Sequence, residues 1–136
     1  NPIRALSNFL RVLKPSGVVY LAVPDMRRTF DRDRAETSLD HVLRDYRQGP
    51  ETSRLDHFLE WMRVVHGIRD EAEARREADA LMARGYRIHF HCWTQTGLLE
   101  LLAAVRRDPG LAFEIELVVR LGEENLFILS REARTP

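Results

Sequence analysis

Residues 87–94, with the sequence RIHFHCWT, place two histidines and a tryptophan at alternate positions. If the segment is extended, the side chains of His89, His91 and Trp93 share one face, and the intervening apolar side chains share the other. Two imidazoles and an indole on one face suit three kinds of chemistry. They could ligate a metal ion, remove a proton from a substrate hydroxyl, or form the polar wall of a binding pocket.

The three roles differ in how much the sequence supports them. A zinc ion needs three or four ligands, and His57, His66 or Asp25 could complete the set only through the fold, so we assign no metal ligand. Imidazole titrates near neutral pH, which makes His89 and His91 candidate general bases. A purely structural role, with one histidine buried and the other in solvent, is also open. We favour a substrate-pocket wall, with Trp93 stacking on a sugar or other ring.

The composition is that of one folded domain. The chain has 136 residues, of which 44% are hydrophobic and 31% charged, and its formal net charge is zero. A neutral chain gives no reason to expect a nucleic-acid partner. Cys92 is the only cysteine, and no apolar run approaches the roughly 20 residues of a membrane span. We therefore expect a cytoplasmic protein without a membrane partner.

Hydrophobic spacing predicts an α/β layout with a helical insert. Helices are expected at about 1–13, 38–48, 53–65, 70–83 and 96–107, and strands at 18–23, 111–119 and 126–130. The run at 18–23 is apolar without interruption, which is typical of a strand in the interior of a parallel sheet. Only two further strands are predicted, both at the far end of the chain, so the layout looks incomplete. An uncovered edge on residues 18–23 would favour a homodimer or aggregation through that edge.

The stretch FLRVLKPSGVVYLAVPD, residues 9–25, resembles the class I S-adenosylmethionine-dependent methyltransferases, specifically their type 11-like group. In that group a helix ending in R-x-L-K-P-G-G leads into the fifth strand of a seven-stranded Rossmann-like sheet. Here Arg11, Leu13, Lys14, Pro15 and Gly17 match, and Ser16 stands at the first glycine. VPDMRRTFDRDRAET and IHFHCWT are also similar to a subgroup often found among cell-envelope and polysaccharide genes.

The resemblance implies the C-terminal half of a Rossmann-like methyltransferase sheet. It would contain one parallel-type strand, a helical insert and a terminal antiparallel strand pair. The chain would be one partial domain: helix and central strand in 1–25, an insert that binds the acceptor in 26–93, and helix and hairpin in 94–136. The implied function is to bind a small-molecule or sugar-type methyl acceptor. The alternative is a non-catalytic, methyltransferase-like interaction domain. A histidine-based metal-binding module is a further alternative that we favour less.

The cofactor motif of that family is missing. These enzymes hold S-adenosylmethionine on a glycine-rich turn, and no Gly-x-Gly occurs in this chain. The complete enzyme would use S-adenosylmethionine, but we expect this chain alone not to bind it, and we assign no cofactor ligand.

Three further residues are candidates for acceptor binding. Asp25 ends the apolar strand, where open α/β sheets place their ligands, although it could equally be a turn or cap residue. Arg27 and Arg28 could bind an anionic acceptor, although the acidic residues that follow favour a self-neutralised loop.

Overall fold

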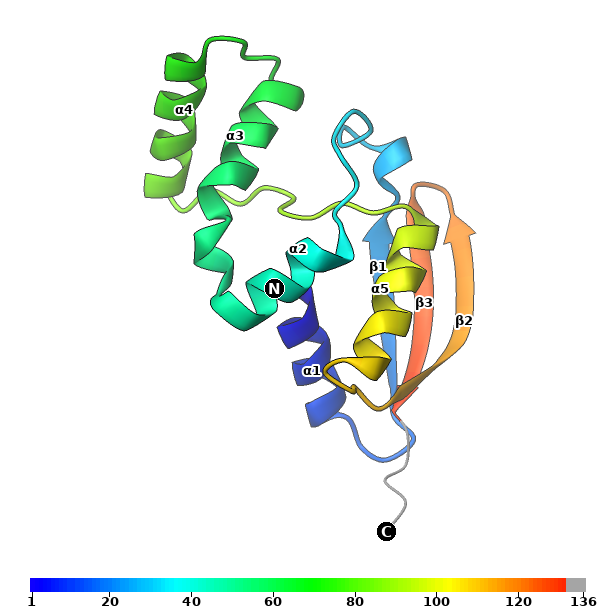
Figure 1. Ribbon diagram of the computed structural model, residues 1–136. Helices are drawn as coiled ribbons and strands as arrows, with labels where there is room; N and C mark the ends of the chain where they lie inside the picture. The colour runs from blue at the N-terminus through cyan, green and yellow to red at the C-terminus, as the bar shows by residue number, and fades with distance from the viewer. Residues whose placement is uncertain (132–136) are drawn as a thin grey trace.

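The computed structural model describes residues 1–131 as an α/β fold, which confirms the predicted class (Figure 1). The α helices in this range are α1 (Pro2–Val12), α2 (Leu39–Gln48), α3 (Arg54–Val64), α4 (Glu71–Ala83) and α5 (Gln95–Arg107). The strands are β1 (Val18–Pro24), β2 (Phe113–Leu121) and β3 (Glu124–Arg131). Two short 3-10 turns, η1 (Met26–Arg28) and η2 (Pro50–Thr52), precede or separate the insert helices.

Local signals account for the entry into β1. The Asn1 side chain caps α1 by accepting hydrogen bonds from the backbone N–H groups of Ile3 and Arg4. A turn follows α1, in which the Gly17 N–H donates to the Lys14 carbonyl over 2.9 Å. A Cβ at Gly17 would lie 2.9 Å from that same oxygen, so the turn needs glycine there. Ser16 adopts a φ of 61°, a left-handed conformation that suits glycine better.

The sheet has the order β1-β3-β2 and is antiparallel throughout the described residues. The sequence predicted β1 as a parallel-type strand in the sheet interior, and within this chain that prediction is wrong. β1 pairs antiparallel with β3, from Val18 opposite Ser130 to Pro24 opposite Glu124, and its other edge pairs with no strand among residues 1–131. Apolar residues on both faces specify burial, but they do not specify the direction of a neighbouring strand.

Helices α1, α2 and α5 contribute to a core on one face of the sheet (Figure 1). This core comprises Ile3, Leu6, Leu10, Val19, Val42, Trp93, Leu98, Leu101, Leu102, Val105, Phe113, Phe127 and Leu129. The opposite face is open: Tyr20 on β1 is 63% exposed, and Leu117 on β2 is 47% exposed. In register, Tyr20 lies opposite Ile128 and Ile128 opposite Leu117, so these apolar side chains form one continuous strip.

The insert forms a second core. Helices α3 and α4 pack together with the segment before α5 around Phe58, Trp61, Met62, Ala74, Ala78 and Ile88. Asp70 caps α4 by accepting from the Glu73 N–H over 2.7 Å, as expected from the Asp70-x-x-Glu73 spacing. Only Ala74 and Ala78 of α4 are buried, so this helix is mostly solvated.

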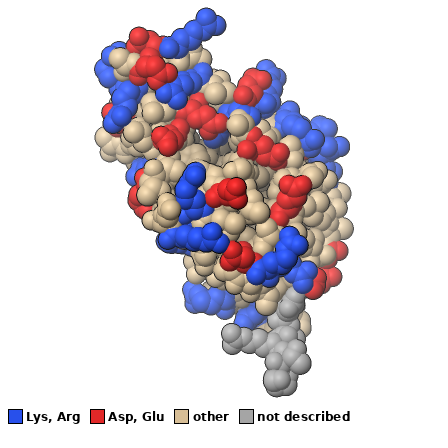
Figure 2. Space-filling model, in the orientation of Figure 1, with Lys and Arg blue, Asp and Glu red and all other residues tan. Residues whose placement is uncertain are grey.

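Basic and acidic side chains alternate on the face seen in Figure 2, without a large area of one sign. None of the helices among residues 1–131 combines the length and apolar character that a membrane crossing requires. The mixture of signs on this face accords with the formal net charge of zero.

Candidate functional site

The RIHFHCWT segment runs beside the sheet without joining its ladders. Its single bridge pairs Trp93 with Asp25 in parallel, and the Met26 N–H donates to the Trp93 carbonyl over 3.0 Å. The rings of His91 and Trp93 stack, with centroids 5.5 Å apart and planes 20° from parallel. His89 has other partners: its Nδ1 lies 2.7 Å from an Asp31 carboxylate oxygen, and its ring stacks on Phe30. The structure therefore separates His89 from His91.

A buried arginine holds this segment in place. The Arg34 guanidinium donates to the His89 carbonyl over 2.6 Å and to the Phe90 carbonyl over 3.4 Å. It also donates to Asp31 over 2.8 Å and to Glu60 on α3 over 2.9 Å. Burial lowers the pKa of Arg34, but the hydrogen bonds to Glu60 and Asp31 more than offset burial and raise that pKa overall. Arg34 thus joins the loop after η1, helix α3 and the segment carrying His91.

Four metal-ligating side chains meet where α2, α3 and this segment converge. They are His41, Asp45, His57 and His91, and one donor atom from each lies within 4.8 Å of the others. His41 and Asp45 are four residues apart on α2 and so share a face of the helix. The His41 and His57 Nε2 atoms are 3.0 Å apart, and the Asp45 Oδ2 atom lies 3.3 Å from His41 Nε2 and 3.7 Å from His91 Nε2.

The cluster is sheltered from water and incompletely hydrogen-bonded. The Asp45 side chain is 1% exposed and that of His91 is 11% exposed. The Ser53 hydroxyl donates to Asp45 Oδ2 over 2.8 Å, but Asp45 Oδ1 and His91 Nε2 are buried with no hydrogen-bond partner among the described residues. Burial, followed by the neighbouring histidines, lowers the pKa of His91 to about 4. Burial and then His41 also lower the pKa of His57.

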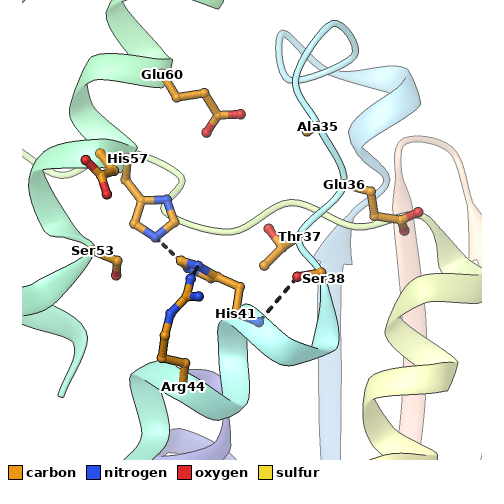
Figure 3. A pocket seen from close by; sticks show the side chains of 10 residues that line it. Ala35, Glu36, Thr37, Ser38, His41, Arg44, Ser53, His57 and Glu60 are labelled. Atoms are coloured by element: carbon orange, nitrogen blue, oxygen red, sulfur yellow. Dashed lines mark hydrogen bonds between the residues drawn. The ribbon is translucent and has the colours of Figure 1, made fainter. Parts of the chain in front are cut away.

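Two hollows adjoin the cluster. The first, of about 390 Å³, is lined by His41 and His57 together with Ser38, Arg44, Ser53 and Glu60 among others. Figure 3 shows His41 and His57 pointing toward one another across it, from α2 and α3. The second, of about 480 Å³, is lined by Asp45, His57, Phe90, His91 and Trp93 and has Asn1, Glu51 and Arg54 among its other lining residues. Of the three residues predicted to form one pocket wall, His91 and Trp93 line the second hollow and His89 does not.

The remaining candidates lie elsewhere. Asp25 is fully buried and accepts two hydrogen bonds from the Arg27 guanidinium, over 2.8 and 2.6 Å, and one from the Arg27 backbone N–H. These hydrogen bonds hold the pKa of Asp25 below its ordinary value. Arg27 and Arg28 line a separate hollow, away from the wall that contains His91 and Trp93. Cys92 is buried, and burial raises the pKa of its thiol.

One sequence signal for the cluster was not among the predicted sites. His41-x-x-x-Asp45 on a predicted helix places an imidazole and a carboxylate on one helical face, which is a spacing used by metal sites. His57 was considered only as a distant further ligand. His66 and Asp25, considered with it, lie outside the cluster: His66 contacts Trp61 and Asp25 pairs with Arg27.

Comparison of the chain with protein-family models, curated proteins and solved structures gives no match. The function is therefore inferred from the residues and their geometry.

Proposed function

We propose that this chain is the C-terminal, acceptor-binding half of an S-adenosylmethionine-dependent methyltransferase that acts on a small, sugar-type molecule. The observation that carries the proposal is the hollow walled by His91 and Trp93. Trp93 bridges to Asp25 immediately after β1, so this hollow lies near the carboxyl end of that strand, where open α/β sheets bind their ligands. Its volume of about 480 Å³ is in the range of small-molecule sites.

The sheet supports the proposal of a larger Rossmann-like enzyme. The element order of helix, strand, insert, helix and antiparallel strand pair is the order that the resemblance implies. The unpaired edge of β1 adjoins an apolar groove of about 150 Å³ whose lining includes Leu21, Val23, Leu6 and Phe9. A neighbouring strand with apolar side chains would cover this groove, and a second helical layer would cover Tyr20 and the open face. Where neither the neighbouring strand nor the second helical layer is present, we propose a second copy of this chain as the partner of the unpaired β1 edge.

The lining residues suit a ring-shaped, hydroxylated acceptor. Phe90 and Trp93 offer aromatic surface, while Asn1, Glu51 and Arg54 offer hydrogen-bonding groups at the same hollow. Methyl transfer is an in-line displacement, so the chief task of these residues is to position the acceptor. A pKa near 4 makes His91 a weak proton acceptor at neutral pH, and His89 lies outside this wall. We therefore assign positioning, rather than proton removal, to this half of the enzyme.

The two tryptophans provide a test of acceptor binding with an internal control. A panel of neutral, acidic and phosphorylated monosaccharides is titrated into ¹⁵N-labelled chain, and the two indole N–H signals are followed by NMR. Trp93 lines the hollow, whereas Trp61 is buried between α3 and α4, so only the Trp93 signal should shift. Arg54→Met should weaken binding of the anionic sugars, and Arg47→Met, which removes a surface pair with Asp108, should not. Equal shifts at both indoles, or none with any sugar, would contradict the proposal.

Cofactor binding by this chain is tested separately. Calorimetric titration of the chain with S-adenosylmethionine should show no low-micromolar binding, because no glycine-rich turn is present to approach the cofactor. The coding sequence that precedes Asn1 should supply that turn after an apolar strand. Low-micromolar affinity of this chain for the cofactor, or an upstream sequence without such a turn, would instead favour another function, such as a non-catalytic interaction domain.

A further inference from the structure

We propose that His41, Asp45, His57 and His91 form a binding site for a divalent transition-metal ion, with zinc the best match. Three imidazoles and one carboxylate are ligands that zinc commonly takes, and four of them complete a tetrahedral shell. Asp45, His57 and His91 also line the proposed acceptor hollow, but the ligand assignment uses neither S-adenosylmethionine nor an acceptor, so a zinc titration tests it separately from the proposed methyltransferase function.

The spacing of the donor atoms fits one ion. Zinc–nitrogen and zinc–oxygen bonds of 2.0–2.2 Å place two donors on a tetrahedral centre about 3.3 Å apart. The measured separations are 3.0 Å for His41 Nε2 to His57 Nε2, 3.3 Å for His41 Nε2 to Asp45 Oδ2, and 3.7 Å for His91 Nε2 to Asp45 Oδ2. These three distances lie within a few tenths of an ångström of the tetrahedral value. The other pairs of donor atoms lie within 4.8 Å of one another, and side-chain rotation toward a shared ion would have to shorten the wider ones.

The unpaired atoms are an independent indication of a ligand. Proteins seldom leave a buried polar atom without a partner, because no hydrogen bond then replaces its lost hydration. His91 Nε2 and Asp45 Oδ1 are both buried without a partner among residues 1–131, and both belong to this cluster. A bound cation would satisfy His91 Nε2 directly and would lie beside the carboxylate that carries Asp45 Oδ1. It would also compensate the carboxylate charge of Asp45, whose side chain is 1% exposed.

Arg44 favours one tautomer of the neutral His41 ring, and metal binding requires the other. Its guanidinium lies 3.0 Å from His41 Nδ1 and can only donate, so Nδ1 accepts and Nε2 carries the proton of the neutral ring. A metal-bound imidazole carries its proton on the nitrogen that does not bind the metal. Metal binding through Nε2 therefore moves the proton to Nδ1 and displaces Arg44. Because Arg44 is exposed, this displacement needs only a side-chain rotation.

The ion would connect three parts of the chain. His41 and Asp45 lie on α2, His57 lies on α3, and His91 lies on the segment that leads to α5. An ion shared among them would join α2, which packs in the core of the sheet, to α3, which packs in the second core, in addition to the hydrogen bonds of Arg34. Four protein ligands and the sheltered position are typical of a structural site. We expect metal binding to stabilise the fold, because the four ligands come together only in the native state.

The test begins with the chain stripped of metal by a chelator and then dialysed. Calorimetric titration with zinc should give one site per chain, and cobalt(II) should give the ligand-field bands of a tetrahedral nitrogen and oxygen site. Stoichiometric zinc should raise Tm, because the ion binds the native state alone. Absence of zinc binding by the unmodified chain would overturn the proposal, whether or not any variant folds.

Variants identify the ligands. His57→Gln and His91→Gln should each weaken zinc binding at least about 100-fold, since even outer-shell partners of a metal ligand are worth 10–100-fold. His89→Gln is the matched control: it lies two residues from His91 but pairs with Asp31, so affinity should be unchanged. Arg44→Gln should raise affinity severalfold, because it removes a cation and frees His41 Nδ1. Equal affinities in all four variants would contradict the assignment, and circular dichroism of the apo forms verifies that each one folds.

Discussion

The burial of Arg34 leads to a quantitative prediction for Arg34→Met. The Arg34 side chain is 1% exposed, and its partner Asp31 is 2% exposed. Removing the guanidinium leaves the Asp31 carboxylate charged and buried, with only His89 and Thr29 to bond it. Removing one partner of a buried pair costs about 3–5 kcal/mol. This loss is a large part of the free energy of unfolding of about 5–15 kcal/mol that is usual for such domains. At a few degrees per kcal/mol, Tm should fall by roughly 10–20 °C.

The variant should also disturb the site, because Arg34 holds the carbonyls of His89 and Phe90 next to His91. Urea unfolding followed by circular dichroism gives the free-energy change. The matched control is Arg32→Met, in the same loop: Arg32 and Asp33 are 72% and 74% exposed and 3.6 Å apart, so the change should stay within about 0.5 kcal/mol.

A double variant separates charge burial from packing. Adding Asp31→Leu to Arg34→Met removes the stranded carboxylate and should recover much of the lost stability, because an apolar pair of similar volume replaces a buried ion pair at little cost. Glu60 is 31% exposed and remains hydrated in either variant. A loss below about 1 kcal/mol for Arg34→Met, or no recovery in the double variant, would refute this reasoning.

The sheet and Asp25, the residue that follows β1, allow two more predictions. Arg27 holds the pKa of buried Asp25 below its unfolded value of about 3.9, so the pair stabilises the fold above that value, and the stabilisation is lost as pH falls through the lower folded pKa. Asp25→Asn should therefore lower the urea midpoint at pH 7, and its difference from the unmodified chain should shrink in acid; a difference independent of pH would contradict the role of the charge. The unpaired edge of β1 and the open face beside it should make the chain self-associate at high concentration. Tyr20→Lys should reduce this association in light scattering, whereas Val64→Lys on α3 should not; a monodisperse unmodified chain would count against it.

The helices were predictable because their signals are local. Asn1, Ser38, Asp70 and Thr94 each accept a hydrogen bond from a backbone N–H two or three residues later, so cap and helix lie within a few residues of one another. The predicted helix boundaries differ from the observed ones by at most one residue. The terminal hairpin was predictable for the same reason, since alternation in 111–119 and the turn at Gly122 are properties of neighbouring residues.

Strand partners and the histidine cluster were not predictable in this way. The alternation in residues 87–94 suggested that His89 and His91 would lie on one face and act together. The segment forms only one isolated bridge. Because no ladder of hydrogen bonds holds it as a regular strand, alternate side chains need not point to the same face. His89 pairs with Asp31, and His91 lies toward α2 and α3.

The amino-acid sequence by itself determined where the helices and strands lie and that β1 is apolar on both faces, because capping, periodicity and turn chemistry act over a few residues. Only the tertiary structure decided that His41, Asp45, His57 and His91 meet, and that Arg34 is buried rather than free for a ligand. The residues of each group lie far apart in the sequence, and only the packing of α2, α3 and the segment before α5 against one another brings them together.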